Sequence, residues 1–165
     1  MSENSVLNDR LDIFVTIGTD HHQFTRLIDW LDEWLEKNPS HAERTLVQHG
    51  QSRASHHARN QAFFDFDELQ QTIARADAII VHGGPGSIFE ARAAGRLPIA
   101  VPRDSAHDEV VDDHQQRFAR YLADDGLVTL CETKERFWAA LDQVMADPNT
   151  ARLAQADERV TETII

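Results

Sequence analysis

The chain has 165 residues, of which 16 are Lys or Arg and 28 are Asp or Glu, which gives a formal net charge of −12. This length supports one well-buried domain rather than two, and so acidic a surface repels nucleic-acid backbones, so DNA or RNA binding is not expected. The single cysteine, Cys131, excludes an internal disulfide and a Cys-based zinc site, which is typical of a reducing compartment.

Residues 1–10 are polar and lack the basic and then apolar pattern of a signal peptide. No apolar stretch approaches the ~18 residues that cross a bilayer. We therefore expect a cytoplasmic protein without direct membrane insertion, which reaches the inner face of a membrane only through a partner.

Along the rest of the chain, continuous apolar runs alternate with segments in which apolar residues recur every three to four positions, as in an amphipathic helix. The pattern predicts strands at 11–17, 45–49, 62–64, 78–81, 97–101 and 126–130, and helices at 24–35, 67–75, 88–94, 115–122 and 137–145. Apolar strands alternating with helices indicate a Rossmann-like, doubly wound α/β domain, with a mostly parallel sheet and helices on both faces. We assign this domain to 11–146 and expect a tail at 147–165, which is a candidate for docking on a partner.

Ligands of such sheets bind beyond the carboxyl ends of the strands, so the loops at 18–21, 82–87 and 102–114 are expected to converge. The loop His82-Gly83-Gly84-Pro85-Gly86-Ser87 joins a buried strand to a helix. Its glycines let a diphosphate approach the backbone, and the amides of the first helical turn point at such an anion. Glycines also serve tight turns, and the loop is neither a dinucleotide fingerprint nor a Walker loop.

Two helix starts offer polar side chains with two interpretations each. Glu90 suits a ribose-binding carboxylate, but Ser87 and Glu90 also fit a capping box, in which Glu90 returns to the backbone of Ser87. Asp113 and Gln116 fit the same box at the next helix, which leaves His114 and Gln115 without an evident structural role. Their imidazole and amide groups are candidates for binding sugar hydroxyls.

Arg103 follows a predicted strand and is a candidate for pairing with a phosphate or a sugar carboxylate. The alternative is a solvated surface arginine. The adjacent pairs His21-His22 and His56-His57 point apart on most backbones, and no metal-binding helical spacing occurs, so we expect no metal site.

Several motifs in order resemble the C-terminal domain of glycosyltransferase family 28. They are Phe14-Val15-Thr16-Ile17-Gly18-Thr19, the loop 82–87 with Glu90, Gly95, Pro98, Val101-Pro102-Arg103, and Val111-Asp112-Asp113-His114-Gln115. Within that family the chain looks closest to the small, separate-chain UDP-sugar transferase subunits of the dolichol and bacterial exopolysaccharide pathways.

The resemblance implies a UDP-sugar hexosyltransferase half that needs no metal or other cofactor. A membrane-anchored partner chain would bind the lipid-linked saccharide acceptor. By similarity, Gly18, Thr19 and residues 83–87 surround the diphosphate, Glu90 the ribose, and Gln115 with Gln116 the sugar hydroxyls. His21, in the first loop, is the local candidate for a general base.

Two alternatives remain at this point. A non-catalytic scaffold subunit would bind UDP without needing Glu90 or Gln115 for activity, and a different Rossmann-type enzyme would prefer a dinucleotide. The residues do not distinguish the sugar that is transferred or its acceptor.

Overall fold

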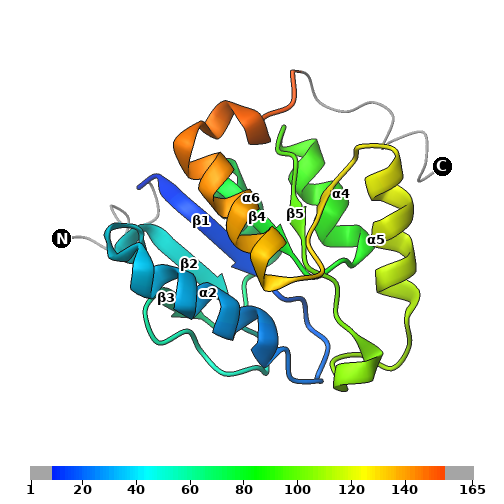
Figure 1. Ribbon diagram of the computed structural model, residues 1–165. Helices are drawn as coiled ribbons and strands as arrows, with labels where there is room; N and C mark the ends of the chain where they lie inside the picture. Colours follow the sequence, from blue (N-terminus) through cyan, green and yellow to red (C-terminus); the bar gives the residue numbers. More distant parts are fainter. Residues whose placement is uncertain (1–8, 155–165) are drawn as a thin grey trace.

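The computed structural model describes residues 9–154, which form one sheet with helices on both faces (Figure 1). The strands are β1 (Leu11–Thr16), β2 (Thr45–Gln48), β3 (Arg59–Gln61), β4 (Ala76–Val81), β5 (Ile99–Ala100) and β6 (Thr129–Leu130). Their order is β3-β2-β1-β4-β5-β6, and every neighbouring pair is parallel. The predicted Rossmann-like class is therefore confirmed, and the strand order reverses between β1 and β4, where such sheets bind ligands.

Two helical layers cover the sheet. The helices are α2 (Thr25–Lys37), α3 (Phe66–Ala74), α4 (Pro85–Ala93), α5 (His114–Asp124) and α6 (Lys134–Ala146). Figure 1 shows α2 and α6 together in front of the sheet, and their apolar side chains share one core cluster, while α3, α4 and α5 contribute to a second. No helix within residues 9–154 has both the length and the apolar character needed to cross a bilayer.

The central strands explain why the sheet reads as unbroken apolar runs. In β1, Ile13 and Val15 pack in the core cluster under α2 and α6, whereas Phe14 packs in the opposite one, and all three are fully buried. All six residues of β4 are buried as well. A strand covered on both faces needs apolar side chains at nearly every position, so the continuous apolar run located it.

The third strand was predicted at 62–64 and lies at β3, three residues earlier. The three residues of β3, Arg59, Asn60 and Gln61, are polar and pair with β2 at the edge of the sheet. An edge strand that is largely open to solvent needs no apolar run, so the apolar residues at 62–64, which directly follow β3, were mistaken for the strand.

The chain continues to pack on the domain beyond the boundary predicted at 146. A 3-10 helix at Pro148–Ala151 follows α6, and the amide of Leu97 donates to the carbonyl of Ala151 at 2.8 Å. The amide of Leu153 donates to Gly95 in the same way, at 2.9 Å. Of the predicted tail, only residues 155–165 lie outside the described part of the chain.

Candidate functional site

A cavity of about 570 Å³ opens beyond the carboxyl ends of β1 and β4. Two of the three loops expected to converge, 18–21 and 82–87, meet there together with Gln115 at the start of α5. The third, 102–114, does not line this cavity, and its residues 107–109 line a second one instead. The lining residues are Thr16, Gly18, Thr19, Asp20, Gln48, Phe63, Phe64, Leu69, His82, Gly84, Pro85, Gly86, Ser87, Glu90 and Gln115. Its volume falls in the range of small-molecule sites.

The N-terminus of α4 presents unsatisfied amides to this cavity. Gly84 is the N-cap and has no side chain to offer, and Pro85 at the first helical position has no N–H. The first amide of this helix with an intrahelical acceptor is that of Ile88, which donates to Gly84 at 3.3 Å. The amides of Gly86 and Ser87 have no such acceptor within residues 9–154, so this end of the helix attracts an anion.

His82 is wedged between the two glycine loops. A Cβ atom on Gly18 would lie 2.6 Å from Nε2 of His82, and one on Gly84 would lie 2.4 Å from Cε1. These two glycines therefore make room for the imidazole ring, and not only for a ligand. Burial lowers the pKa of His82 to about 4, against the opposing effect of the hydrogen bond that its Nδ1 donates to Oε1 of Gln115. The ring is neutral at pH 7, so positive potential in the cavity comes from the helix end.

Glu90 lines the cavity, and its carboxylate forms no hydrogen bond or ion pair within the described chain. The capping box predicted for Ser87 and Glu90 is wrong, because α4 begins at Pro85 and places Ser87 inside the first turn. Desolvation raises the pKa of Glu90. A desolvated carboxylate without a partner costs stability, which is typical of a side chain kept for a ligand.

At the start of α5 the structure separates three neighbouring candidates. Gln115 lines the cavity and approaches Nδ1 of His82 at 3.3 Å. His114 is exposed and pairs with Asp112, and Gln116 is not among the lining residues. Asp113 is the N-cap, as predicted, but its side chain makes no capping bond, so the second capping box is wrong as well.

Arg103 matches neither of its two interpretations, because its side chain is fully buried. Its guanidinium donates to the carbonyls of Ile17, His22 and Glu109, each at 2.8 Å. Arg103 therefore stabilises the backbone of the loop after β1 and does not line the cavity. Gly83 is also structural, since a Cβ there would lie 3.1 Å from Pro102, and its φ of +91° suits glycine.

Sequence reasoning missed the apolar wall of the cavity. Phe63, Phe64 and Leu69 follow β3, and Phe63 is 51% exposed. Phe64 is held by an edge-on contact with Phe14, at 5.7 Å between ring centres. The two adjacent aromatic residues were the available signal, but the sequence reading placed them inside the strand predicted at 62–64. An exposed aromatic ring beside a polar pocket is suited to a planar ligand.

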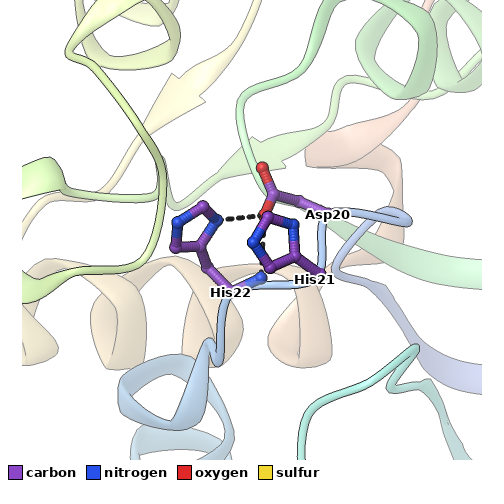
Figure 2. Close-up of side chains that lie close together, drawn as sticks. All are labelled: Asp20, His21 and His22. Carbon is purple, nitrogen blue, oxygen red and sulfur yellow. Dashed lines mark hydrogen bonds and ion pairs between the residues drawn. The ribbon is translucent and has the colours of Figure 1, made fainter.

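His21 does not line this cavity. It faces a second cavity of about 740 Å³, lined by residues from the loop after β1, α2 and the 107–109 segment. The expectation that His21 and His22 point apart is wrong, because their rings stack at 4.2 Å between centres (Figure 2). Both rings approach Asp20, a carboxylate that lines the first cavity.

Hydrogen bonds set the ionisation of Asp20. Burial acts to raise its pKa, but the backbone and side-chain hydrogen bonds from His22 and the charge of Arg103 outweigh it, so the pKa is lowered. Asp20 is therefore ionised at neutral pH and carries a negative charge to the boundary between the two cavities.

The chain is similar in sequence to known glycosyltransferases. An N-acetylglucosamine transferase from Polaromonas sp. strain JS666, which acts on N-acetylmuramyl-(pentapeptide) pyrophosphoryl-undecaprenol, is 34% identical over 89 residues, covering 54% of this chain and 22% of that protein. Its counterpart from Acinetobacter baylyi is 32% identical over 107 residues, covering 62% and 28%. The chain thus spans about a quarter of the length of these relatives.

Solved structures support the fold. The NMR solution structure of ALG13 matches with a TM-score of 0.62 and 18% identity, covering 94% of this chain and 95% of that one. The crystal structure of MurG from Acinetobacter baumannii matches with a TM-score of 0.57 and 22% identity, covering 87% and 43%.

The family itself is shown by a model that matches most of the chain. The model for the glycosyltransferase family 28 C-terminal domain aligns with residues 12–163, which include both cavity loops and Glu90. The predicted resemblance is confirmed, and the chain belongs to the glycosyltransferase family 28 C-terminal domain family.

Proposed function

We propose that this domain is the donor-binding half of a glycosyltransferase, which holds a UDP-sugar in the cavity between β1 and α4. One observation carries the proposal: unsatisfied amides at the start of α4 and the unpaired carboxylate of Glu90 open onto the same 570 Å³ space. Both features cost stability in the free protein, and a nucleoside diphosphate satisfies both at once.

The proposed placement of the donor follows from the chemistry of the walls. The diphosphate lies at the amides of Gly86 and Ser87, beside Gly18 and Thr19. The ribose hydroxyls then donate to Glu90, and the base lies against the apolar wall formed by Phe63, Phe64 and Leu69. Gln115 is left to bind hydroxyls of the transferred sugar.

In the proposed reaction an acceptor hydroxyl attacks the anomeric carbon, and the bond from that carbon to the diphosphate oxygen breaks. Negative charge builds on the leaving UDP, and the fixed amides of α4 stabilise it without rearrangement. The hydroxyl proton goes to a general base that the acceptor-binding half supplies or, within this chain, to His21, which faces the neighbouring cavity.

The acceptor half is proposed to be a separate, membrane-anchored chain that binds a lipid-linked saccharide, as expected for an exopolysaccharide or glycolipid pathway. The similarity to ALG13, of which this chain covers 95%, supports the proposal. Under this proposal the protein works at the cytoplasmic face of the membrane through that partner.

Calorimetry with UDP, ADP and NAD, in buffer containing EDTA, tests the donor site. We expect UDP to bind best and Glu90→Ala to weaken it at least tenfold, since one buried charged hydrogen bond contributes about 1.5–3 kcal/mol. Glu43→Ala is the matched control, because Glu43 is exposed and does not line the cavity. Preference for NAD would refute the proposal in favour of a dinucleotide enzyme.

Reconstitution tests the catalytic role. Mixing the chain with membranes that contain its partner and a labelled UDP-sugar is expected to yield a labelled lipid, and Glu90→Ala and Gln115→Ala are expected to reduce the yield. UDP binding combined with full activity of both variants would instead identify a scaffold subunit.

A further inference from the structure

The loop after β1 brings three metal-binding side chains together. One ligand atom from each of Asp20, His21 and His22 lies within 4.8 Å of the other two, and Figure 2 shows both rings next to the carboxylate. Within residues 9–154 this is the group of this kind that the fold assembles. We propose that Asp20, His21 and His22 form a binding site for a divalent transition-metal ion such as Zn²⁺, which leaves the general base of the proposed reaction to the acceptor-binding half.

The loop is preorganised for this role. Oδ1 of Asp20 accepts the amide of His22 at 2.8 Å, which closes the turn and brings the two side chains together. Arg103 holds both ends of the segment, because it donates to Ile17 and to His22 from a fully buried position. Binding therefore requires little ordering of the backbone.

The distances need only side-chain adjustment. Nδ1 of His22 lies 2.6 Å from Oδ1 of Asp20, and Nδ1 of His21 lies 3.9 Å from the same oxygen. Ligand atoms of a tetrahedral zinc ion are about 3.3 Å apart, given Zn–N and Zn–O distances near 2.0–2.1 Å. One separation has to widen and the other to close, each by less than about 1 Å, and the exposed ring of His21 is free to rotate.

The ligand set selects the class of metal. Two imidazoles and one carboxylate suit Zn²⁺, Co²⁺ or Ni²⁺ rather than Mg²⁺ or Ca²⁺, which prefer oxygen, and three protein ligands leave a position open to an outside group.

Two carboxylates near Asp20 are already neutralised by basic side chains. In the 740 Å³ cavity, Glu109 pairs with Arg26 and Glu33 pairs with Lys134. Within residues 9–154, Asp20 forms its ion pairs with the two imidazoles, and the charge of the buried Arg103 acts on it from farther away. Asp20 also lines the cavity proposed for the diphosphate, so, if that function holds, a cation here offsets the repulsion between two anions.

The sequence contains a matched control pair. His56 and His57 are adjacent too, but they reach two different carboxylates, with His56 4.0 Å from Asp32 and His57 3.2 Å from Glu36. Asp32 is already bound by Arg53 and Ser55. His56 and His57 therefore lie beside carboxylates but share none, so substituting them measures how much metal the protein binds nonspecifically.

The test uses the untagged full chain, stripped of metal and titrated with Zn²⁺, Co²⁺ and Mg²⁺ in the absence of nucleotide. We expect one equivalent of Zn²⁺, a change in the visible absorption of Co²⁺, and no saturable binding of Mg²⁺. His21→Asn/His22→Asn should weaken Zn²⁺ binding roughly tenfold or more, whereas His56→Asn/His57→Asn should not change it.

Equal Zn²⁺ affinity in the wild type and in His21→Asn/His22→Asn, or equal loss in the control pair, overturns the proposal. Should the double variant fail to fold, judged by thermal unfolding, Asp20→Asn takes its place, and unchanged Zn²⁺ affinity in that variant also overturns it. UDP binding in EDTA is a separate result, so failure of this site and failure of the donor site are distinguishable.

Discussion

Substituting Gly84 by Ala tests how tightly the two loops close around His82. The new Cβ would lie 2.4 Å from Cε1 and 2.9 Å from Nε2 of the ring, whereas ordinary contact begins near 3.4 Å, so the ring must retreat by about 1 Å. The ring already lies close to the backbone of Gly18, where an added Cβ would be 2.6 Å from Nε2, so there is little room for it to move in that direction. Such overpacking costs about 1–3 kcal/mol.

The backbone offsets part of this cost. Gly84 has φ −71° and ψ 141°, which alanine adopts freely, and removing a glycine from the unfolded chain contributes about 0.4–1 kcal/mol of stability. We therefore expect Gly84→Ala to lower the free energy of unfolding by about 1–2 kcal/mol, measured by urea denaturation followed by circular dichroism.

Two further variants locate the cause. Gly86→Ala is the matched control, because its Cβ meets nothing within 4 Å and lies in a helix, so stability should rise by about 0.5–1 kcal/mol. In a His82→Ala background, Gly84→Ala should lose its penalty. The reasoning is refuted if Gly84→Ala is as stable as the wild type, or if the penalty persists without His82.

Three other variants test the ionisable groups of the site. The pKa of His82 falls to about 4 in the folded state, so between about pH 6.5 and pH 4 the unfolded chain binds a proton that the folded chain does not. Over that range the free energy of unfolding of the wild type should fall by about 1–3 kcal/mol more than that of His82→Asn, measured by urea denaturation at several pH values. Equal losses in the two proteins would contradict this. Glu90→Gln should raise the thermal midpoint at pH 7, since the pKa of this unpartnered carboxyl is raised, while weakening UDP binding in calorimetry; a lower midpoint would count against it. Arg103→Met should cost about 3 kcal/mol or more in denaturant unfolding, because three carbonyls lose their donor, and a near-neutral effect would show that the brace is dispensable.

Much of the fold was readable from the sequence because its central strands are buried on both faces. The runs at β1 and β4 are apolar at nearly every position, and parallel pairing then fixed which loops share an edge. The edge strand β3 was misplaced because it consists of polar residues whose pairing depends on β2 and not on burial. The glycine-rich turn was predicted as a site since its position after a buried strand is itself a local signal.

The details of the site depended on contacts between distant residues. The capping box predicted at Ser87 failed because a four-residue pattern does not fix where a helix begins, and α4 begins at Pro85, three residues earlier than predicted. At α5 the N-cap is Asp113, as predicted, but its side chain makes no capping bond. The buried position of Arg103 depends on three carbonyls, two of them more than 80 residues away in the chain. The stacking of His21 on His22 depends on the turn closed by Asp20.

The central claim is that peptide amides at the start of α4 bind the diphosphate of a uridine nucleotide. The most direct measurement is a titration of ¹⁵N-labelled protein with UDP, followed by amide chemical shifts in EDTA buffer. We predict that the largest changes fall on Gly84, Gly86 and Ser87, with smaller ones at Gly18 and Thr19. Saturable shifts confined to other parts of the chain, or no shifts at millimolar UDP, would contradict the account.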